Sequence, residues 1–219
     1  MQSKEVVRIL LRIAFIALTS LVIVYVGGGL AFIRKPIPMI YLLFWVMWWA
    51  ITMAGRQQGT TTKYHRQSLV VLVSSILSFP ALALAPEWEY VTFSGPLPRD
   101  SWPSWIGLFL FAVGIALQAW SMWQLRGYFT VRLGVQLQQK LVTSGPYSIV
   151  RHPGYFSYLL SIIGIGLALS SLITLGLAVL VVIFLVWRIE TEEQMLIEAF
   201  GDSYLEYRKR TKCLVPLIY

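Results

Sequence analysis

Apolar residues run along this chain in six segments, and nearly all charged residues lie between them. The segments cover residues 6–33, 37–54, 68–85, 103–125, 155–169 and 172–190. A helix needs about 20 apolar residues to cross a hydrocarbon core of about 30 Å. Within lipid only helices and closed barrels satisfy the backbone, and these continuous runs lack the alternation of barrel strands. The pattern predicts an all-α integral membrane bundle of five to six transmembrane helices.

The last two apolar segments are short, and only residues 170–171 separate them. This spacing predicts a tight helical hairpin that barely crosses the bilayer. Its second arm continues past Arg188 as a charged helix to about Phe200. Tyr204 and Tyr207 share a face of the helix that follows, and we expect this face to pack against lipid headgroups.

Composition agrees with a membrane protein, since 57% of the residues are hydrophobic and only 13% are charged. If the N-terminus is cytoplasmic, the loops on that side hold 15 of the 18 Lys and Arg residues. An excess of basic residues on the cytoplasmic side is usual, so the net charge of +8 does not indicate a nucleic-acid partner. We expect a multi-pass protein with both termini cytoplasmic, in a bacterial inner membrane or the endoplasmic reticulum.

Metal-binding residue types are scarce. The chain has one cysteine, Cys213, which excludes an internal disulfide and a thiolate cluster. The two histidines, His65 and His152, lie far apart in the sequence and do not suggest a metal site. We therefore expect no metal, and we expect any cofactor to be organic.

Polar residues of specific types gather in the last third of the chain. A long connection ends at His152-Pro153, where a proline suits the first turn of a helix whose N-terminus can bind an anionic group. Arg188 and Glu192 lie four positions apart where the last apolar helix emerges, so they share a helix face. They could form a simple ion pair, but an ionisable residue at the lipid edge is costly and usually functional.

Four motifs at these places resemble the isoprenylcysteine carboxyl methyltransferase family and its phospholipid methyltransferase relatives. The motifs are Leu141-Val-Thr-Ser-Gly-Pro-Tyr147, Arg151-His-Pro-Gly-Tyr155, Arg188 with Glu192-Glu193, and the Phe-Gly-x-x-Tyr-x-x-Tyr of 200–207. The resemblance covers about residues 125–219. It implies N-terminal transmembrane helices over 1–125 and a methyltransferase module over 126–219, made of a cytoplasmic loop, the helical hairpin and a C-terminal amphipathic helix.

The resemblance also implies a cofactor site for S-adenosyl-L-methionine, built without a Rossmann sheet from the last loop and helix. The implied cofactor contacts are Gln136, Gln139, Lys140, Leu141, Val142, Tyr147, His152, Pro153, Gly154, Tyr155 and Glu192. Arg188 matches the position that faces the methyl acceptor, and Arg188 with Glu192 forms the candidate catalytic pair. His152 is a candidate general base, although a hydrogen bond to the cofactor or a loop carbonyl is the simpler role.

The chemistry of these residues favours carboxyl O-methylation. A carboxylate oxygen is already an anion and needs no general base, whereas Arg188 can hold it in a bidentate manner. Glu192 could balance the positive charge of the cofactor. The expected acceptor is an isoprenylcysteine-like or other apolar acid that enters from the bilayer. Alternatives are N-methylation of a phosphatidylethanolamine-type lipid, S-methylation of a small thiol, a reductase or non-enzymatic protein, and a bundle without a site.

Overall fold

The structure is a computed structural model that describes residues 2–55, 61–64, 84–93, 97–125, 128, 134–136 and 139–215. The first part contains α1 (Gln2–Val26), α2 (Leu30–Ile33), α3 (Pro36–Gly55), β1 (Thr61–Tyr64), a helical stretch at 84–92 and α5 (Trp102–Leu125). The second part contains β2 (Gly134–Gln136), the 3-10 helix η2 (Gly145–Ser148), α6 (Pro153–Ala168), α7 (Leu172–Phe200) and α8 (Asp202–Arg210).

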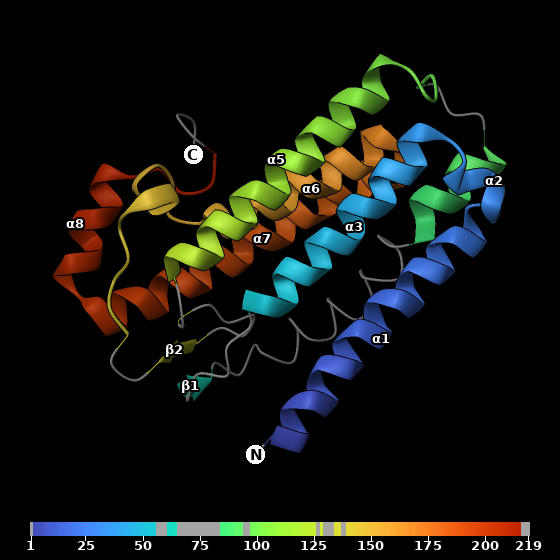
Figure 1. Ribbon diagram of the computed structural model, residues 1–219. Helices are drawn as coiled ribbons and strands as arrows, with labels where there is room; N and C mark the ends of the chain where they lie inside the picture. The colour runs from blue at the N-terminus through green and yellow to red at the C-terminus, as the bar shows by residue number, and fades with distance from the viewer. Residues whose placement is uncertain are drawn as a thin grey trace.

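Four of the described helices, α1, α3, α5 and α7, are long and apolar enough to cross a membrane, and α6 is a shorter apolar helix. In Figure 1, α3, α5, α6 and α7 run side by side while α1 lies along one flank. This arrangement confirms the helical membrane bundle that the sequence predicts. Most of the predicted segment 68–85 lies outside the described residues.

The helices α5 and α6 approach each other closely because small residues line their contact. A Cβ atom added to Gly107 would lie 2.2 Å from the backbone nitrogen of Ala168, and one added to Gly164 would lie 2.6 Å from that of Phe111. Such small-residue contacts bring helix backbones together in membranes, where the hydrophobic effect gives little drive to associate. The position of α6, and of the site at its first turn, therefore depends on these glycines.

The hairpin of α6 and α7 is present as predicted, and its turn is held by hydrogen bonds within the turn and to Glu89, a residue outside the hairpin. Ser170 takes a left-handed backbone with φ 55°, and the hydroxyl of Ser171 accepts a hydrogen bond from the Thr174 amide. The Glu89 carboxylate accepts hydrogen bonds from the amides of Leu172 at 3.1 Å and Ile173 at 3.0 Å. A carboxylate at a helix N-terminus satisfies unpaired N–H groups and complements the helix dipole.

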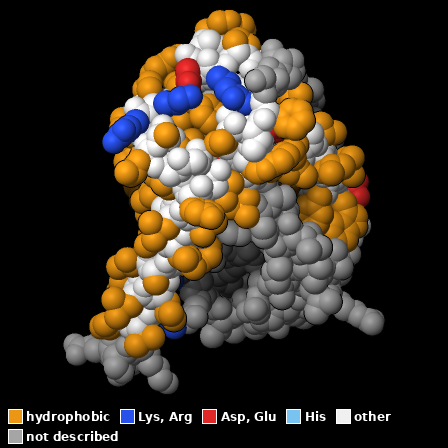
Figure 2. Space-filling view, turned by 90° about the vertical axis from the view of Figure 1, so that its right-hand side faces the viewer, with side chains coloured by type: hydrophobic (Ala, Val, Ile, Leu, Met, Phe, Trp, Pro, Cys, Tyr) orange, Lys and Arg blue, Asp and Glu red, His pale blue; other side chains and the backbone are white. Residues whose placement is uncertain are grey.

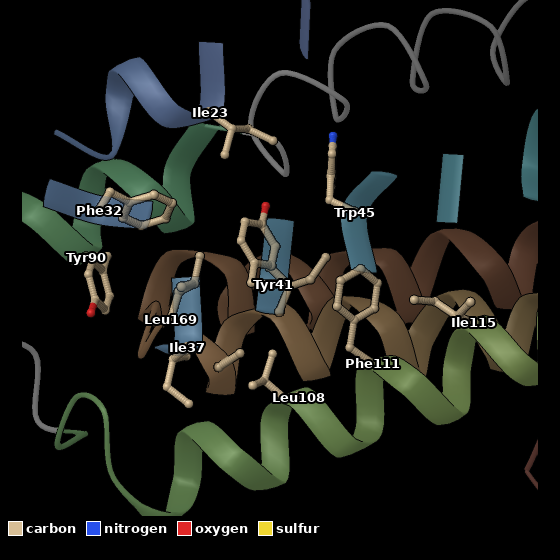
Figure 3. Packing of buried hydrophobic residues seen from close by; sticks show 12 residues of the cluster. Ile23, Phe32, Ile37, Tyr41, Trp45, Tyr90, Leu108, Phe111, Ile115 and Leu169 are labelled. Atoms are coloured by element: carbon tan, nitrogen blue, oxygen red, sulfur yellow. The ribbon is translucent and has the colours of Figure 1, made fainter. Parts of the chain in front are cut away.

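The largest apolar core lies toward the α2 end of the bundle (Figure 3). Tyr41 and Trp45 of α3 pack there against Phe111 of α5, and all three are almost fully buried. Tyr41 also donates a hydrogen bond to the buried Glu87 carboxylate. Figure 2 views this end of the molecule and shows hydrophobic side chains over much of the described surface, with a group of charged side chains near the top. This core holds the scaffold at the end opposite the candidate site.

The two strands connect two loops at the other end of the bundle. β1 and β2 pair antiparallel, with Thr61 opposite Gln136, so the connection after α3 meets the connection after α5. β2 also lies against α7. This small ribbon places part of the predicted cofactor loop beside the helix that carries Arg188 and Glu192.

Candidate active site

The loop that leads into α6 is tied to the segment that follows α8. Arg151 donates its amide hydrogen to the Lys212 carbonyl at 2.8 Å, and His152 donates its own to the Cys213 carbonyl at 3.1 Å. His152 caps α6, and Pro153 occupies its first position, as the sequence predicts. Lys212 and Cys213 thus help to hold the residues that lead into the first turn of α6.

Tyr155, in that first turn, faces the two charged residues of α7. Arg188 donates from Nε to the Tyr155 hydroxyl at 2.6 Å, and this hydroxyl donates in turn to Oε2 of Glu192. The Arg188 guanidinium also lies over the Tyr155 ring, with Cζ 5.5 Å from the ring centroid. Arg188 is only 7% exposed. A buried cation and a carboxylate are therefore held close together through one phenol oxygen.

Tyr147 lies near the same carboxylate. Burial raises the pKa of Tyr147 well above its ordinary value, and the negative charge of Glu192 raises it further. Tyr207 of α8 donates its hydroxyl hydrogen to the Tyr147 carbonyl at 2.6 Å. The structure thus brings together four sequence-predicted site residues, which are Tyr147, Tyr155, Arg188 and Glu192.

A second charged cluster surrounds Glu193, next to Glu192 on the helix but turned toward another face. Its carboxylate pairs with Arg151 at 2.7 Å, with Arg208 at 3.3 Å, and approaches His152 Nε2 at 3.4 Å. Arg151 also donates to the carbonyls of Thr211 and Arg208. This cluster connects α7 to the loop before α6, through Arg151, and to α8, through Arg208.

The Glu193 cluster also offers atoms that could ligate a metal. Ligand atoms of His152, Glu193 and Cys213 lie within 4.8 Å of one another. Two guanidinium groups already neutralise the Glu193 carboxylate, however, and they would repel a dication at the same place. We interpret the cluster as a structural ion-pair network, and the absence of a metal stays a prediction.

The remaining sequence-predicted residues are placed less specifically. Gln136 is in β2, and Gln139 to Val142 form an irregular segment in which Lys140 is exposed. Pro153 and Gly154 begin α6. The His152 imidazole is buried, stacks on the Tyr155 ring and faces Glu193, so it belongs to the Glu193 cluster.

One expectation about α8 is wrong. Tyr204 and Tyr207 do share a face, but they are 1% and 8% exposed and pack inside the protein, not against headgroups. Arg151, Glu193 and Arg208 have no role predicted from the sequence. The two arginines pair with Glu193 only in the folded protein, because they lie far from it in the sequence.

Cys213 provides a direct test of how firmly the C-terminal segment is held. Its thiol is buried, and burial followed by the nearby Glu193 charge raises its pKa. Because the thiolate is the reactive form, we expect maleimide to label the folded protein near neutral pH at least about tenfold more slowly than the same chain in sodium dodecyl sulfate. Cys213 is the only cysteine, so the mass shift reports on it alone. Equal labelling rates would show that the C-terminal segment is not docked.

Comparison with known proteins indicates the class of protein to which this site belongs. Residues 102–203 match the model of the family described as phospholipid methyltransferase. A solved eukaryotic intramembrane Ras methyltransferase, an isoprenylcysteine carboxyl methyltransferase, has a similar fold with a TM-score of 0.63 and 22% identity, covering 96% of this chain and 77% of that one. The helical membrane fold and the match over the site helices indicate the class of integral membrane methyltransferases.

The first of two relatives narrows this class of methyltransferase. Protein-S-isoprenylcysteine O-methyltransferase B of Arabidopsis thaliana is 32% identical over 162 residues, which is 70% of this chain and 82% of the relative. A cobalt-zinc-cadmium resistance protein of Cupriavidus metallidurans is 43% identical over 77 residues, which is 35% of either chain. The chain belongs to the isoprenylcysteine carboxyl methyltransferase family.

Proposed function

We propose that this protein methylates the carboxylate of an apolar acid, such as an S-prenylated cysteine, with S-adenosyl-L-methionine as methyl donor. The observation that carries the proposal is the buried Arg188, which Tyr155 holds beside Glu192 where α7 leaves its apolar stretch. The names of the relatives support the acceptor class, because the Arabidopsis protein is a protein-S-isoprenylcysteine O-methyltransferase.

The residues at the site fit the proposed cofactor. S-adenosylmethionine has a sulfonium and an ammonium group, and the Glu192 carboxylate, with Tyr147 beside it, supplies negative charge for them. A Cβ atom added to Gly154 would meet no atom of the described residues within 4 Å, so the first turn of α6 borders open space on the Gly154 side. The other proposed contacts are those that the family resemblance implies, from Gln136 through Gln139–Val142 to His152–Tyr155.

The acceptor chemistry requires positioning more than proton transfer. The cofactor would supply an electrophilic methyl group, so that an O–CH₃ bond forms while the S–CH₃ bond breaks. Arg188 would hold the acceptor carboxylate and orient one oxygen, and its burial excludes water that would weaken this contact. The acceptor oxygen is already an anion, and the proposal therefore assigns no general base, including His152.

The same proposal includes a membrane orientation. The site end carries the first residues of α6 and the charged part of α7, and the loops of this end hold most of the basic residues. By the positive-inside rule, both termini and the site face the cytoplasm. An apolar acceptor would then reach Arg188 laterally from the cytoplasmic leaflet of a bacterial inner membrane or the endoplasmic reticulum.

Calorimetry on the detergent-purified protein tests the cofactor assignment. We expect S-adenosylmethionine to bind the wild type and Arg188→Ala, and Glu192→Ala to bind it about 10–100-fold more weakly because a charge-assisted contact is lost. Glu198→Ala, which removes an exposed glutamate further along α7, is the control that should bind as the wild type does. A folded wild-type sample that binds no S-adenosylmethionine would refute the proposal.

A second candidate rests on the family model, whose description is phospholipid methyltransferase. In that case the acceptor is a headgroup amine, and Arg188 would hold the lipid phosphate. An acceptor comparison separates the two functions, because tritiated methyl groups would enter phosphatidylethanolamine in one case and an N-acetylated S-prenylcysteine in the other. Only the carboxylate product is a base-labile methyl ester.

A further inference from the structure

The hydroxyl of Tyr155 stands between the two residues that the proposed function assigns to different ligands. It accepts a hydrogen bond from Arg188 Nε at 2.6 Å and donates one to Glu192 Oε2. The two α7 residues are four positions apart on one helix face, a spacing at which opposite charges attract. The phenol oxygen therefore links the proposed acceptor group to the proposed donor group through a single atom.

We propose that the Tyr155 hydroxyl is a positioning group that couples methyl-acceptor binding at Arg188 to methyl-donor binding at Glu192. This role rests on the proposed function and extends it to the relation between the two sites. Two neighbours hold the Tyr155 ring, because it stacks on His152 with ring centroids 5.6 Å apart and the Arg188 Cζ atom lies 5.5 Å from its centroid. Its hydroxyl is thus held in place without either ligand.

The direction of the coupling follows from how consecutive hydrogen bonds polarise one another. The hydrogen bond from Arg188 draws electron density from the phenol oxygen of Tyr155. This makes the Tyr155 hydroxyl a stronger donor to Glu192. When an acceptor carboxylate attracts the guanidinium, the first bond weakens, and so does the second. The weaker hydrogen bond neutralises less of the negative charge on Glu192, so this carboxylate attracts a cationic ligand more strongly. Acceptor binding therefore tightens donor binding. By linkage, donor binding tightens acceptor binding by the same factor.

The test uses S-adenosylhomocysteine, the demethylated product, as the probe of the donor site. It lacks the sulfonium charge, so direct attraction between a sulfonium and the acceptor carboxylate cannot produce the coupling, and no turnover occurs. We expect its dissociation constant for the full-length wild type to fall about fivefold or more when an N-acetylated S-prenylcysteine saturates the acceptor site. In Tyr155→Phe, which keeps the ring, the ratio of the two constants should fall to about one.

Tyr158→Phe is the matched control. It removes a hydroxyl one turn further along α6, where the ring stacks on Trp48 with centroids 6.0 Å apart, and it should keep the wild-type ratio. Glu192→Gln retains the shape of the side chain and an oxygen that can accept from Tyr155, but it removes the negative charge at that end of the hydrogen-bond chain. This variant should therefore also lose the coupling. The test therefore does not depend on Tyr155→Phe alone.

The outcomes separate the role of Tyr155 from the function itself. A wild-type ratio near one, or a Tyr155→Phe ratio equal to that of the wild type, would overturn the coupling role while leaving methyl transfer intact. Weaker S-adenosylhomocysteine binding in Tyr155→Phe with an unchanged ratio would make Tyr155 a simple cofactor contact. A folded wild type that binds neither probe would instead refute the proposed function.

Discussion

Replacing Arg188 with alanine is expected to lower kcat/KM for an apolar acid about a thousandfold. Truncating one partner of a buried, hydrogen-bonded charge pair costs about 2–5 kcal/mol, and each 1.4 kcal/mol is a factor of ten. Lysine keeps the charge but not the planar pair of donors. The kcat/KM of Arg188→Lys should therefore lie between those of the wild type and Arg188→Ala, about 10–100-fold below the wild type. Transfer of a tritiated methyl group into the extracted ester measures the effect.

The control for this experiment is Arg210→Ala. Arg210 is exposed on α8 and pairs with Glu206 on the same helix, so its removal should leave methyl transfer near the wild-type rate. Retained S-adenosylmethionine binding by Arg188→Ala would show that the variant is folded. If such a folded variant kept kcat/KM within about threefold of the wild type, Arg188 would not hold the acceptor.

Adding a methyl group at Gly107 is expected to disrupt the packing that positions α6. In Gly107→Ala the new Cβ would lie 2.2 Å from the Ala168 nitrogen and 2.6 Å from the Gly164 carbonyl oxygen, and backbone atoms cannot move aside alone. Overpacking of this kind costs about 1–3 kcal/mol or more. At about 2–4 °C per kcal/mol for a chain of this size, the melting temperature should fall by roughly 6–12 °C for a 3 kcal/mol loss.

Gly176→Ala in α7 provides a matched control. A Cβ atom there would meet no atom of the described part of the chain within 4 Å, so the substitution should leave the melting temperature unchanged or raise it slightly. Melting curves of both variants in the same detergent, with S-adenosylmethionine binding as the second measurement, give the comparison. Equal melting temperatures would mean that α5 and α6 are not in backbone contact.

The helical fold was predictable because lipid leaves the chain few choices. Continuous apolar runs predicted α1, α3, α5 and the α6–α7 hairpin, and Gly201 ends α7 where a residue with positive φ is needed. The packing partners were not predictable in the same way. Glu89 lies 82 positions before Ser171, and no local pattern indicates that its carboxylate caps α7.

The site was predictable where the residues share one helix and less so where they do not. Arg188 and Glu192 share a face by spacing alone, but their connection through Tyr155 requires the position of α6. Glu193 is turned about 100° from Glu192 around the helix, so it meets α8 and the loop before α6 instead. The roles of the cofactor loop residues and the division of the chain at residue 125 stay predictions.

The short length of α6 has a consequence for the surrounding lipid. Its 16 residues extend about 24 Å, less than the roughly 30 Å of a hydrocarbon core. A bilayer meets such a mismatch by thinning locally or by letting polar groups sink below the headgroup level. Either adjustment brings the interface down to the first turn of α6, so an acid whose tail stays in the leaflet need not leave the membrane to be methylated.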